Sequence, residues 1–265
     1  MTQRRSRLDR LMQFVRPRPI RDFAPPPTQV APDLWTIERR LRMPGGPTLP
    51  TRSTVVRLPA GGLLVVSPPP VEAGGLEALD ALGAVEDVLV PNSFHYLNAA
   101  DFVARYPGAT LRLAPGLHDR IAGLPGEELT ASAPAAWGGA VEHQILGPVR
   151  GISEVAVFHR PSGTLMLMDL AFNMATFESA FERIAWRLSG VPASFGPSRT
   201  ARTFLLNDRR MAADFLERVL AWPFQRVLVA HGEALEDRAS EVFRHAFAPF
   251  LADANAPQAG GSAQA

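Results

Sequence analysis

The chain has 265 residues, enough to bury a full hydrophobic core, and 46% of them are hydrophobic, which excludes a wholly disordered protein. Its formal net charge of +1 gives no reason to expect a nucleic-acid partner. Because cysteine is absent, disulfides, thiolate metal sites and cysteine nucleophiles are excluded, and any metal must be bound by imidazole and carboxylate groups.

All 27 basic residues are arginine, which is typical of a bacterial-like genomic composition and excludes Schiff-base lysines and the lysine of a P-loop. No run approaches the roughly 18 apolar residues that a membrane span requires. The first residues lack the apolar core and cleavage site of a secretion signal, so the expected location is the cytoplasm.

Three regions are expected: a basic arm with a Pro-rich linker over residues 1–30, a folded domain over 31–251, and a disordered tail over 252–265. In the arm, apolar residues recur at helical spacing, at Leu8, Leu11, Met12 and Val15. The preferred interpretation is a mobile or locally packed arm. The alternative is a helix in residues 1–22 that makes peripheral contact with a membrane or docks on a partner.

Along the chain, periodicity and turn residues predict alternating groups of strands and helices. Strands are expected at 34–37, 53–58, 63–66, 88–90, 110–113, 142–146, 155–159, 164–168 and 226–230. Helices are expected at 76–82, 99–106, 174–189, 208–221 and 236–251. The Pro- and Gly-rich loop 43–50 is either a flap over a site or an ordinary surface connection. The turn at 160–163 indicates a hairpin. If His159 pairs with Thr164 there, Glu154 lies opposite Asp169, and His159 lies about 17 Å from Asp169.

Three apolar strands end on side chains that can bind metal or move a proton, namely His95, Asp169 and His231. In open α/β sheets, ligands bind at the carboxyl ends of strands. We therefore expect these three side chains to converge on one site.

The order of elements resembles the metallo-β-lactamase fold, an α/β four-layer αββα sandwich. The resemblance is carried by Leu63 to Ser67, Val88 to Pro91, Gly147 to Ser153, Leu167 to Asp169 and Leu228 to Gly232. It covers roughly residues 33–250 and implies a metal site at these strand ends.

The chain departs from that family where the family's metals bind. The family's loop His-x-His-x-Asp-His corresponds here to residues 92–98, Asn-Ser-Phe-His-Tyr-Leu-Asn. One register places Asn92, Phe94 and Leu97 at the histidine positions, and the other places Ser93, His95 and Asn98 there. The histidine expected near residue 150 is also missing. The segments 106–109, 114–117 and 158–165 resemble an uncharacterised branch of the superfamily, a domain of unknown function, with a similarly degenerate loop.

The remaining residues allow at most one mononuclear site, because a catalytic zinc usually has three protein ligands and a two-metal site needs about twice as many. The cofactor is therefore expected to be none or one divalent metal, Zn, Fe or Mn, on His95, Asp169 and His231. Each residue also has a structural interpretation. His95 can be a hydrogen-bonded loop imidazole, Asp169 can cap the turn that follows it, and His231 can be a packing residue.

Arg150, Asn92 and Tyr96 are candidates for binding a ligand. If Arg150 occupies the place of the missing histidine, its guanidinium and the two histidines form a pocket for a carboxylate or phosphate. The alternative, which we prefer, is an ion pair of Arg150 with Asp169 or Glu154.

Two functions follow as hypotheses. The first is a divergent, non-catalytic protein, a pseudoenzyme that binds a small anionic ligand or a partner but no nucleic acid. The alternative is a mononuclear metal-dependent hydrolase with Asp169 and His231 as catalytic residues.

Overall fold

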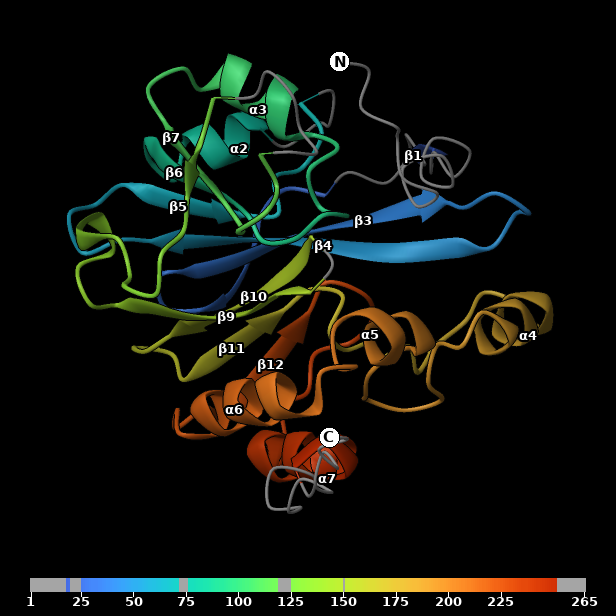
Figure 1. The fold of residues 1–265 in the computed structure, drawn as a ribbon. Coiled ribbons are helices and arrows are strands. Elements are labelled where there is room, and N and C mark those ends of the chain that lie inside the picture. The colour runs from blue at the N-terminus through green and yellow to red at the C-terminus, as the bar shows by residue number, and fades with distance from the viewer. Residues whose placement is uncertain (1–17, 20–24, 72–75, 119–124, 150, 252–265) are drawn as a thin grey trace, which may run out of the picture.

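The computed structural model describes residues 18–19, 25–71, 76–118, 125–149 and 151–251. In these ranges two β-sheets pack face to face, and helices cover the outer side of each sheet (Figure 1). The predicted αββα sandwich is confirmed. Residues 1–17, Arg150 and the tail 252–265 lie outside the described residues.

The larger sheet has eight strands in the order β1-β3-β4-β5-β6-β7-β8, with β2 paired to β3. Its strands are β1 (Arg18–Pro19), β2 (Thr28–Ala31), β3 (Leu34–Arg42), β4 (Thr48–Arg57), β5 (Leu63–Val66), β6 (Val85–Val90), β7 (Thr110–Leu113) and β8 (Glu127–Glu128). Strands β5, β6 and β7 run parallel, so the residues that follow them, including Ser67 and the loop that carries His95, lie at one edge of the sheet.

The smaller sheet has four strands in the order β12-β11-β10-β9. They are β9 (Val141–Val149), β10 (Ile152–His159), β11 (Thr164–Leu167) and β12 (Arg226–Val229). The expected pairing of His159 with Thr164 is present. Strands β11 and β12 are parallel and Leu167 pairs with Val229, so Asp169 and His231 each follow that last pair by two residues at the same edge.

The helices lie on the two outer sides of the sandwich. Helices α2 (Leu76–Asp80) and α3 (Ala99–Arg105) lie beside the larger sheet, and α5 (Arg199–Phe204), α6 (Arg209–Leu220) and α7 (Ala239–Leu251) lie beside the smaller one (Figure 1). A short 3₁₀ turn, η1 (Ala135–Trp137), precedes β9. Within the described ranges, no helix is both long and apolar enough to cross a membrane.

Helix α4 (Ala180–Leu188) is shorter than the predicted helix over 174–189, and α5 was not expected. The reason is tertiary pairing: Phe172 exchanges backbone hydrogen bonds with Gly196, and the N–H of Asn173 bonds to the carbonyl of His231. These contacts keep the chain after Asp169 extended, although its apolar spacing favours a helix.

The predicted flap loop, 43–50, is the tip of a long hairpin, because β3 and β4 pair on either side of a turn at residues 43–47 and residues 48–50 already belong to β4. Helix α4 packs at the tip of this hairpin. The buried carboxylate of Glu182 accepts from the N–H of Thr48 at 2.9 Å, and Nε1 of Trp186 donates to the carbonyl of Thr48 at 2.9 Å.

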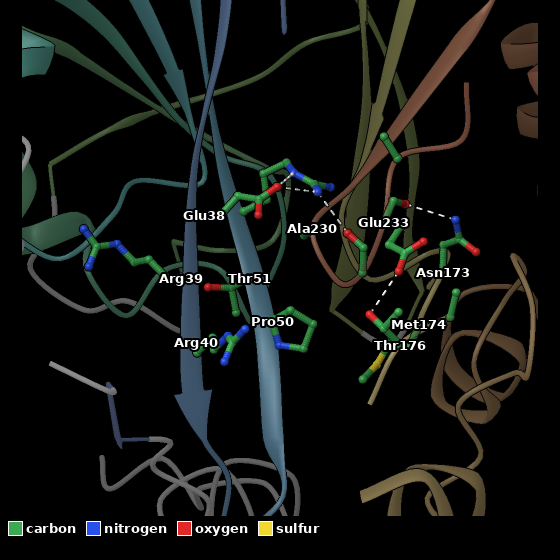
Figure 2. Close-up of a pocket in the computed structure, with 14 residues that line it drawn as sticks. Glu38, Arg39, Arg40, Pro50, Thr51, Asn173, Met174, Thr176, Ala230 and Glu233 are labelled. Atoms are coloured by element: carbon green, nitrogen blue, oxygen red, sulfur yellow. Dashed lines mark hydrogen bonds and ion pairs between the residues drawn. The ribbon is translucent and has the colours of Figure 1, made fainter. Parts of the chain in front are cut away.

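A pocket of about 360 Å³ separates the hairpin from the loops at 173–176 and 230–234 (Figure 2). Its polar lining includes Arg52, Asn173, Thr176 and Glu233. The pocket borders the candidate site through Pro50 and Gly232, which are also part of its wall.

Gly232 closes the turn after His231. Its φ is +111°, and a Cβ at this position would lie 2.1 Å from the carbonyl oxygen of Asn173. Only glycine permits this approach, because an L-residue disfavours positive φ and the added carbon would overlap backbone.

We predict that Gly232→Ala destabilises the fold by more than about 3 kcal/mol, the sum of the positive-φ cost and the forced backbone shift. Gly61→Ala is a matched control, since Gly61 has φ +100° and nothing within 4 Å of its Cβ position. Urea unfolding of both variants measures the difference. Equal destabilisation of the two would show that the steric contact at Gly232 contributes nothing.

Candidate metal centre

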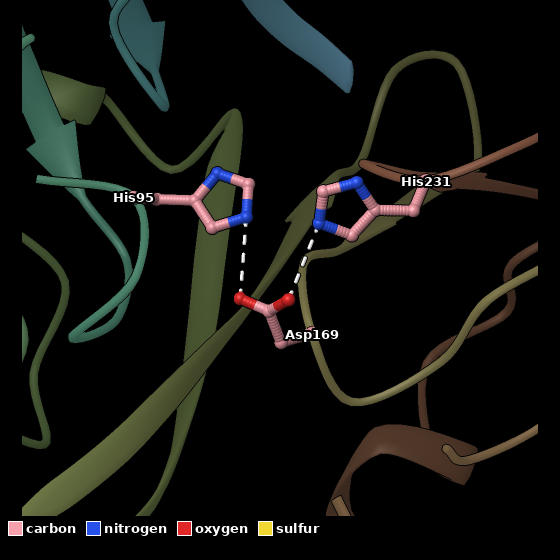
Figure 3. A group of neighbouring side chains, drawn as sticks. All are labelled: His95, Asp169 and His231. Carbon is pink, nitrogen blue, oxygen red and sulfur yellow. Dashed lines mark hydrogen bonds and ion pairs between the residues drawn. The ribbon is translucent and has the colours of Figure 1, made fainter. Parts of the chain in front are cut away.

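His95, Asp169 and His231 meet at the edge where both sheets end (Figure 3). Nε2 of His95 lies 3.2 Å from Oδ2 of Asp169, and Nε2 of His231 lies 3.2 Å from Oδ1. The two imidazole centroids are 5.3 Å apart, and one donor atom from each residue lies within 4.8 Å of the others. The expected convergence of the three side chains is therefore present.

The ring of His231 has a defined tautomer. Its Nδ1 lies 2.9 Å from the carbonyl oxygen of Pro50 on β4. Because a carbonyl oxygen only accepts, Nδ1 carries a proton and donates it. In the neutral ring, Nε2 is then a lone pair that faces a carboxylate oxygen.

The ring of His95 is held by Ser67, whose Oγ lies 2.6 Å from Nδ1. A hydroxyl can donate or accept, so Nε2 of His95 can face Asp169 as a donor or as a lone pair. Ser67 has a φ of +59°, a conformation uncommon for serine, at the residue that follows β5.

Asn92 links this loop to two carboxylates. Its Nδ2 donates to Oε2 of Glu154 and to Oδ2 of Asp169, both at 2.7 Å. Its Oδ1 accepts from the N–H groups of Phe94 and His95. The side chain of Asn92 therefore orients both the loop that carries His95 and the carboxylate of Asp169.

Glu154 is fully buried, with 0% of its surface exposed, below the turn that carries Asp169. Its Oε1 accepts from the N–H groups of Met168 at 2.8 Å and Leu170 at 3.3 Å. Burial raises the pKa of Glu154 to about 8, and the negative charge of Asp169 adds to this increase. The hydrogen bonds from Asn92 and from the backbone act in the opposite direction but are smaller effects.

The pKa of Asp169 shifts in the opposite direction. Burial alone would raise its pKa, but the charge of His95 and the hydrogen bonds from His231 and His95 together lower the pKa below its ordinary range. At neutral pH the pair therefore divides into an ionised Asp169 and a protonated Glu154.

His231 is fixed on two further sides. Phe172 stacks on its ring with centroids 4.8 Å apart. Arg52 is buried and donates to the carbonyl oxygens of Val229 and Gly232, on either side of His231. Its guanidinium also pairs with Glu38.

The three side chains fit a single metal ion. Two imidazole nitrogens and a carboxylate form a common catalytic donor set, and each ligand has the outer hydrogen-bond partner that metal-binding side chains usually have. Neutral His231 and ionised Asp169 would otherwise place two acceptor atoms at 3.2 Å, a contact that requires either a cation or a second proton between them.

The other predicted site residues have different placements. Asn92 lies at the site. Tyr96 packs against the core to which both sheets contribute, and Arg150 is outside the described residues, so their roles remain expectations. His159 lies at the far end of β10 from Glu154 and bonds to Ser162, as the pairing predicts.

Sequence reasoning missed three supports of the site: Ser67, Arg52 and the function of Glu154. The register already placed Glu154 opposite Asp169. A glutamate within the apolar run of β10, every residue of which is buried, is the signal that could have identified it.

Solved structures share this architecture. A metallo-beta-lactamase from Pontibacter korlensis has a TM-score of 0.59 at 14% identity, covering 84% of this chain and 97% of that chain. A putative diflavin flavoprotein fragment from Nostoc sp. PCC 7120 has a TM-score of 0.61 at 11% identity, covering 87% of this chain and 97% of that chain. The mono-zinc form of the metallo-beta-lactamase FIM-1 from Pseudomonas aeruginosa has a TM-score of 0.57 at 11% identity, covering 89% of this chain and 99% of that chain. At these identities the likeness shows the metallo-β-lactamase fold alone.

Comparison with curated proteins gives no match. A family model matches residues 32–184, more than half of the chain, and its range includes His95 and Asp169 but not His231. The chain belongs to the family described as Domain of unknown function (DUF4336).

Proposed function

We propose that this protein binds one divalent metal ion through His95, Asp169 and His231 and supports metal-dependent hydrolysis. One contact carries the proposal. Nε2 of His231 faces Oδ1 of Asp169 at 3.2 Å, while Nδ1 on the other side of the ring donates its proton to Pro50. Once Nε2 gives up any proton to an incoming ion, the ring presents a metal-binding lone pair beside an ionised carboxylate.

The ligand set suits zinc, iron or manganese, with room in the coordination sphere for another group. Such an ion, when bound, acts as a Lewis acid toward a carbonyl or phosphoryl oxygen. The donor set supports one ion, because no further histidine, aspartate or glutamate joins this cluster among the residues that the structure describes.

The chain's own groups set the orientation and charge of the site. Ser67 and Pro50 hold the outer nitrogens of the two imidazoles, and Asn92 directs Oδ2 of Asp169. Glu154 holds a proton at neutral pH, since its pKa is raised to about 8. The site then has a single negative charge, on Asp169, beside which a cation is stabilised.

A second candidate function has its own observation. Asp169 already accepts from Asn92, and both of its oxygens lie at hydrogen-bond distance from an imidazole. If both rings carry two protons, they satisfy the carboxylate without a metal and leave a net positive group. This arrangement suits a non-catalytic protein that binds a small anion.

We predict that the tag-free protein binds about one zinc ion per chain, and that Asp169→Asn and His231→Gln each weaken binding at least about ten-fold because each removes a ligand. Titration calorimetry and elemental analysis measure the affinity and the stoichiometry. His245→Gln is the control, because His245 is exposed on α7. Equal affinity of all four proteins would contradict the metal site.

The ring nitrogens separate the two candidate functions directly. In ¹⁵N-histidine spectra, the metal-site proposal predicts that zinc shifts Nε2 of His231 while Nδ1 keeps its proton. Two protonated nitrogens on both rings, unchanged by zinc, would favour the anion-binding protein.

We further predict that zinc raises the hydrolysis of a chromogenic carboxylic ester or phosphodiester at least about ten-fold, and that a chelator or Asp169→Asn abolishes this increase. Steady-state absorbance measures the rate, with His245→Gln as the control. Stoichiometric zinc without any hydrolysis would retain the metal site and reject the catalytic function for these two ester classes.

The protonation of Glu154 predicts a pH dependence of stability. The pKa of Glu154 rises from 4.5 to about 8 on folding. Its contribution to the free energy of unfolding is therefore fully present below pH 4.5 and is lost as the pH rises to about 8. Glu154→Gln removes this titration, and the variant should lose less stability over this window than the unaltered protein, by on the order of a few kcal/mol.

Urea unfolding in the presence of a chelator, repeated at several pH values, gives the two curves. The variant should also be less stable at the acidic end, because its amide would meet the Nδ2 group of Asn92. Burial lowers the pKa of His143 and of His159 on folding, so their contributions increase with pH, equally in both proteins. Parallel curves would show that Glu154 does not hold its proton.

A further inference from the structure

Helix α4 carries an exposed apolar stripe. Phe181 is 59% exposed, Ile184 56% and Leu188 72%, and these are three of the four large hydrophobic side chains that are exposed in the described part of the chain. At 3.6 residues per turn the three lie within an arc of roughly 60°. Such a concentration on one helix marks an interaction surface.

The opposite face of α4 fixes the helix to the body of the protein. Trp186 and Glu182 are buried there and bond to Thr48 on the hairpin. Arg40 of the same hairpin pairs with Glu178, just before the helix. The stripe therefore faces outward because the other side of the helix is already packed, and in Figure 1 the helix lies apart from α6 and α7.

The charge beside the stripe is positive. Arg183 and Arg187 are exposed on α4 and lie one helical turn apart, next to Ile184. The only acidic residue within the helix, Glu182, is buried and engaged by backbone N–H groups. The outward side of α4 thus combines large apolar side chains with arginine and carries no exposed carboxylate.

We propose that this face of α4 is a docking surface for an anionic lipid membrane, with Phe181, Ile184 and Leu188 entering the interfacial region. Helices that lie in the plane of a membrane combine an apolar face with arginine or lysine beside it. Arginines near an anionic surface add electrostatic attraction, which falls as salt increases.

Charge distinguishes this partner from a second copy of the chain. A two-fold symmetric contact pairs the same patch on both copies. It would place the Arg183 and Arg187 side chains of both copies at one interface, where no exposed carboxylate of α4 pairs with them, and these arginines have no ion-pair partner among the described residues. An anionic surface satisfies the same arginines without repulsion.

Flotation of the full chain with vesicles tests the proposal. We expect binding to phosphatidylcholine vesicles that contain phosphatidylglycerol, little binding to phosphatidylcholine alone, and weaker binding as salt is raised. A variant with Phe181→Ala, Ile184→Ala and Leu188→Ala should partition at least about ten-fold less. Arg183→Ala with Arg187→Ala should also weaken binding, whereas Arg210→Ala with Arg244→Ala, at exposed positions on α6 and α7, should not.

Because the chain has no cysteine, one introduced cysteine reports on one position. A polarity-sensitive dye on Ile184→Cys should shift to the blue with anionic vesicles, and a dye on Arg244→Cys should not. Circular dichroism of each variant establishes that the fold is retained.

Three results would overturn the proposal. The first is failure of the full chain to float with anionic vesicles at low salt. The second is flotation of the triple alanine variant equal to that of the unaltered chain, which would assign binding to another segment such as residues 1–22. The third is a dimer in ultracentrifugation that the triple variant loses while no vesicle binds, which would identify a second copy as the partner.

Discussion

Two buried carboxylates share one amide at the edge of this sandwich, and the candidate site depends on that arrangement. Asn92 donates from one nitrogen to both Glu154 and Asp169. Two ionised carboxylates cannot both be buried here without a large cost, so one of them must hold a proton. The imidazoles lie beside Asp169, which fixes Asp169 as the ionised member and Glu154 as the protonated one.

The backbone positions this pair. Glu154 accepts from the N–H groups on both sides of Asp169, and Arg52 binds the carbonyls on both sides of His231. Both loops are joined again where the N–H of Asn173 bonds to the carbonyl of His231. Since each of the two side chains is held by contacts to the backbone next to it, the fold itself sets their positions relative to each other.

The position of the three candidate ligands could be predicted from the sequence, because it depends on where the strands end. Apolar runs that are followed by His95, Asp169 and His231 indicated three strands, and parallel strands that end at one edge bring the residues after them together. The hairpin turn after His159 was enough to set the register of Glu154 against Asp169.

The supports of the site could not be predicted in the same way. Arg52 lies 177 residues from Val229 in the chain, and no local pattern indicates that contact. The helix expected over 174–189 was too long because Phe172 and Asn173, just before it, pair with distant backbone, and the helix begins only after its N-cap, Ser179. The protonation of Glu154 depends on burial by both sheets, which is a tertiary property.

The site and the exposed face of α4 belong to one continuous packing unit. Phe172 stacks on His231, and it also belongs to a small apolar cluster with Leu49, Met174 and Trp186 of α4. Trp186 faces this cluster, while Ile184 and Leu188 face outward from the same short helix. Close-packed side chains have little room to move, so the position of one fixes the position of its neighbours. A surface that binds the outward face of α4 would therefore hold the metal-binding edge at a defined orientation to that surface, without any change in the conformation of the site.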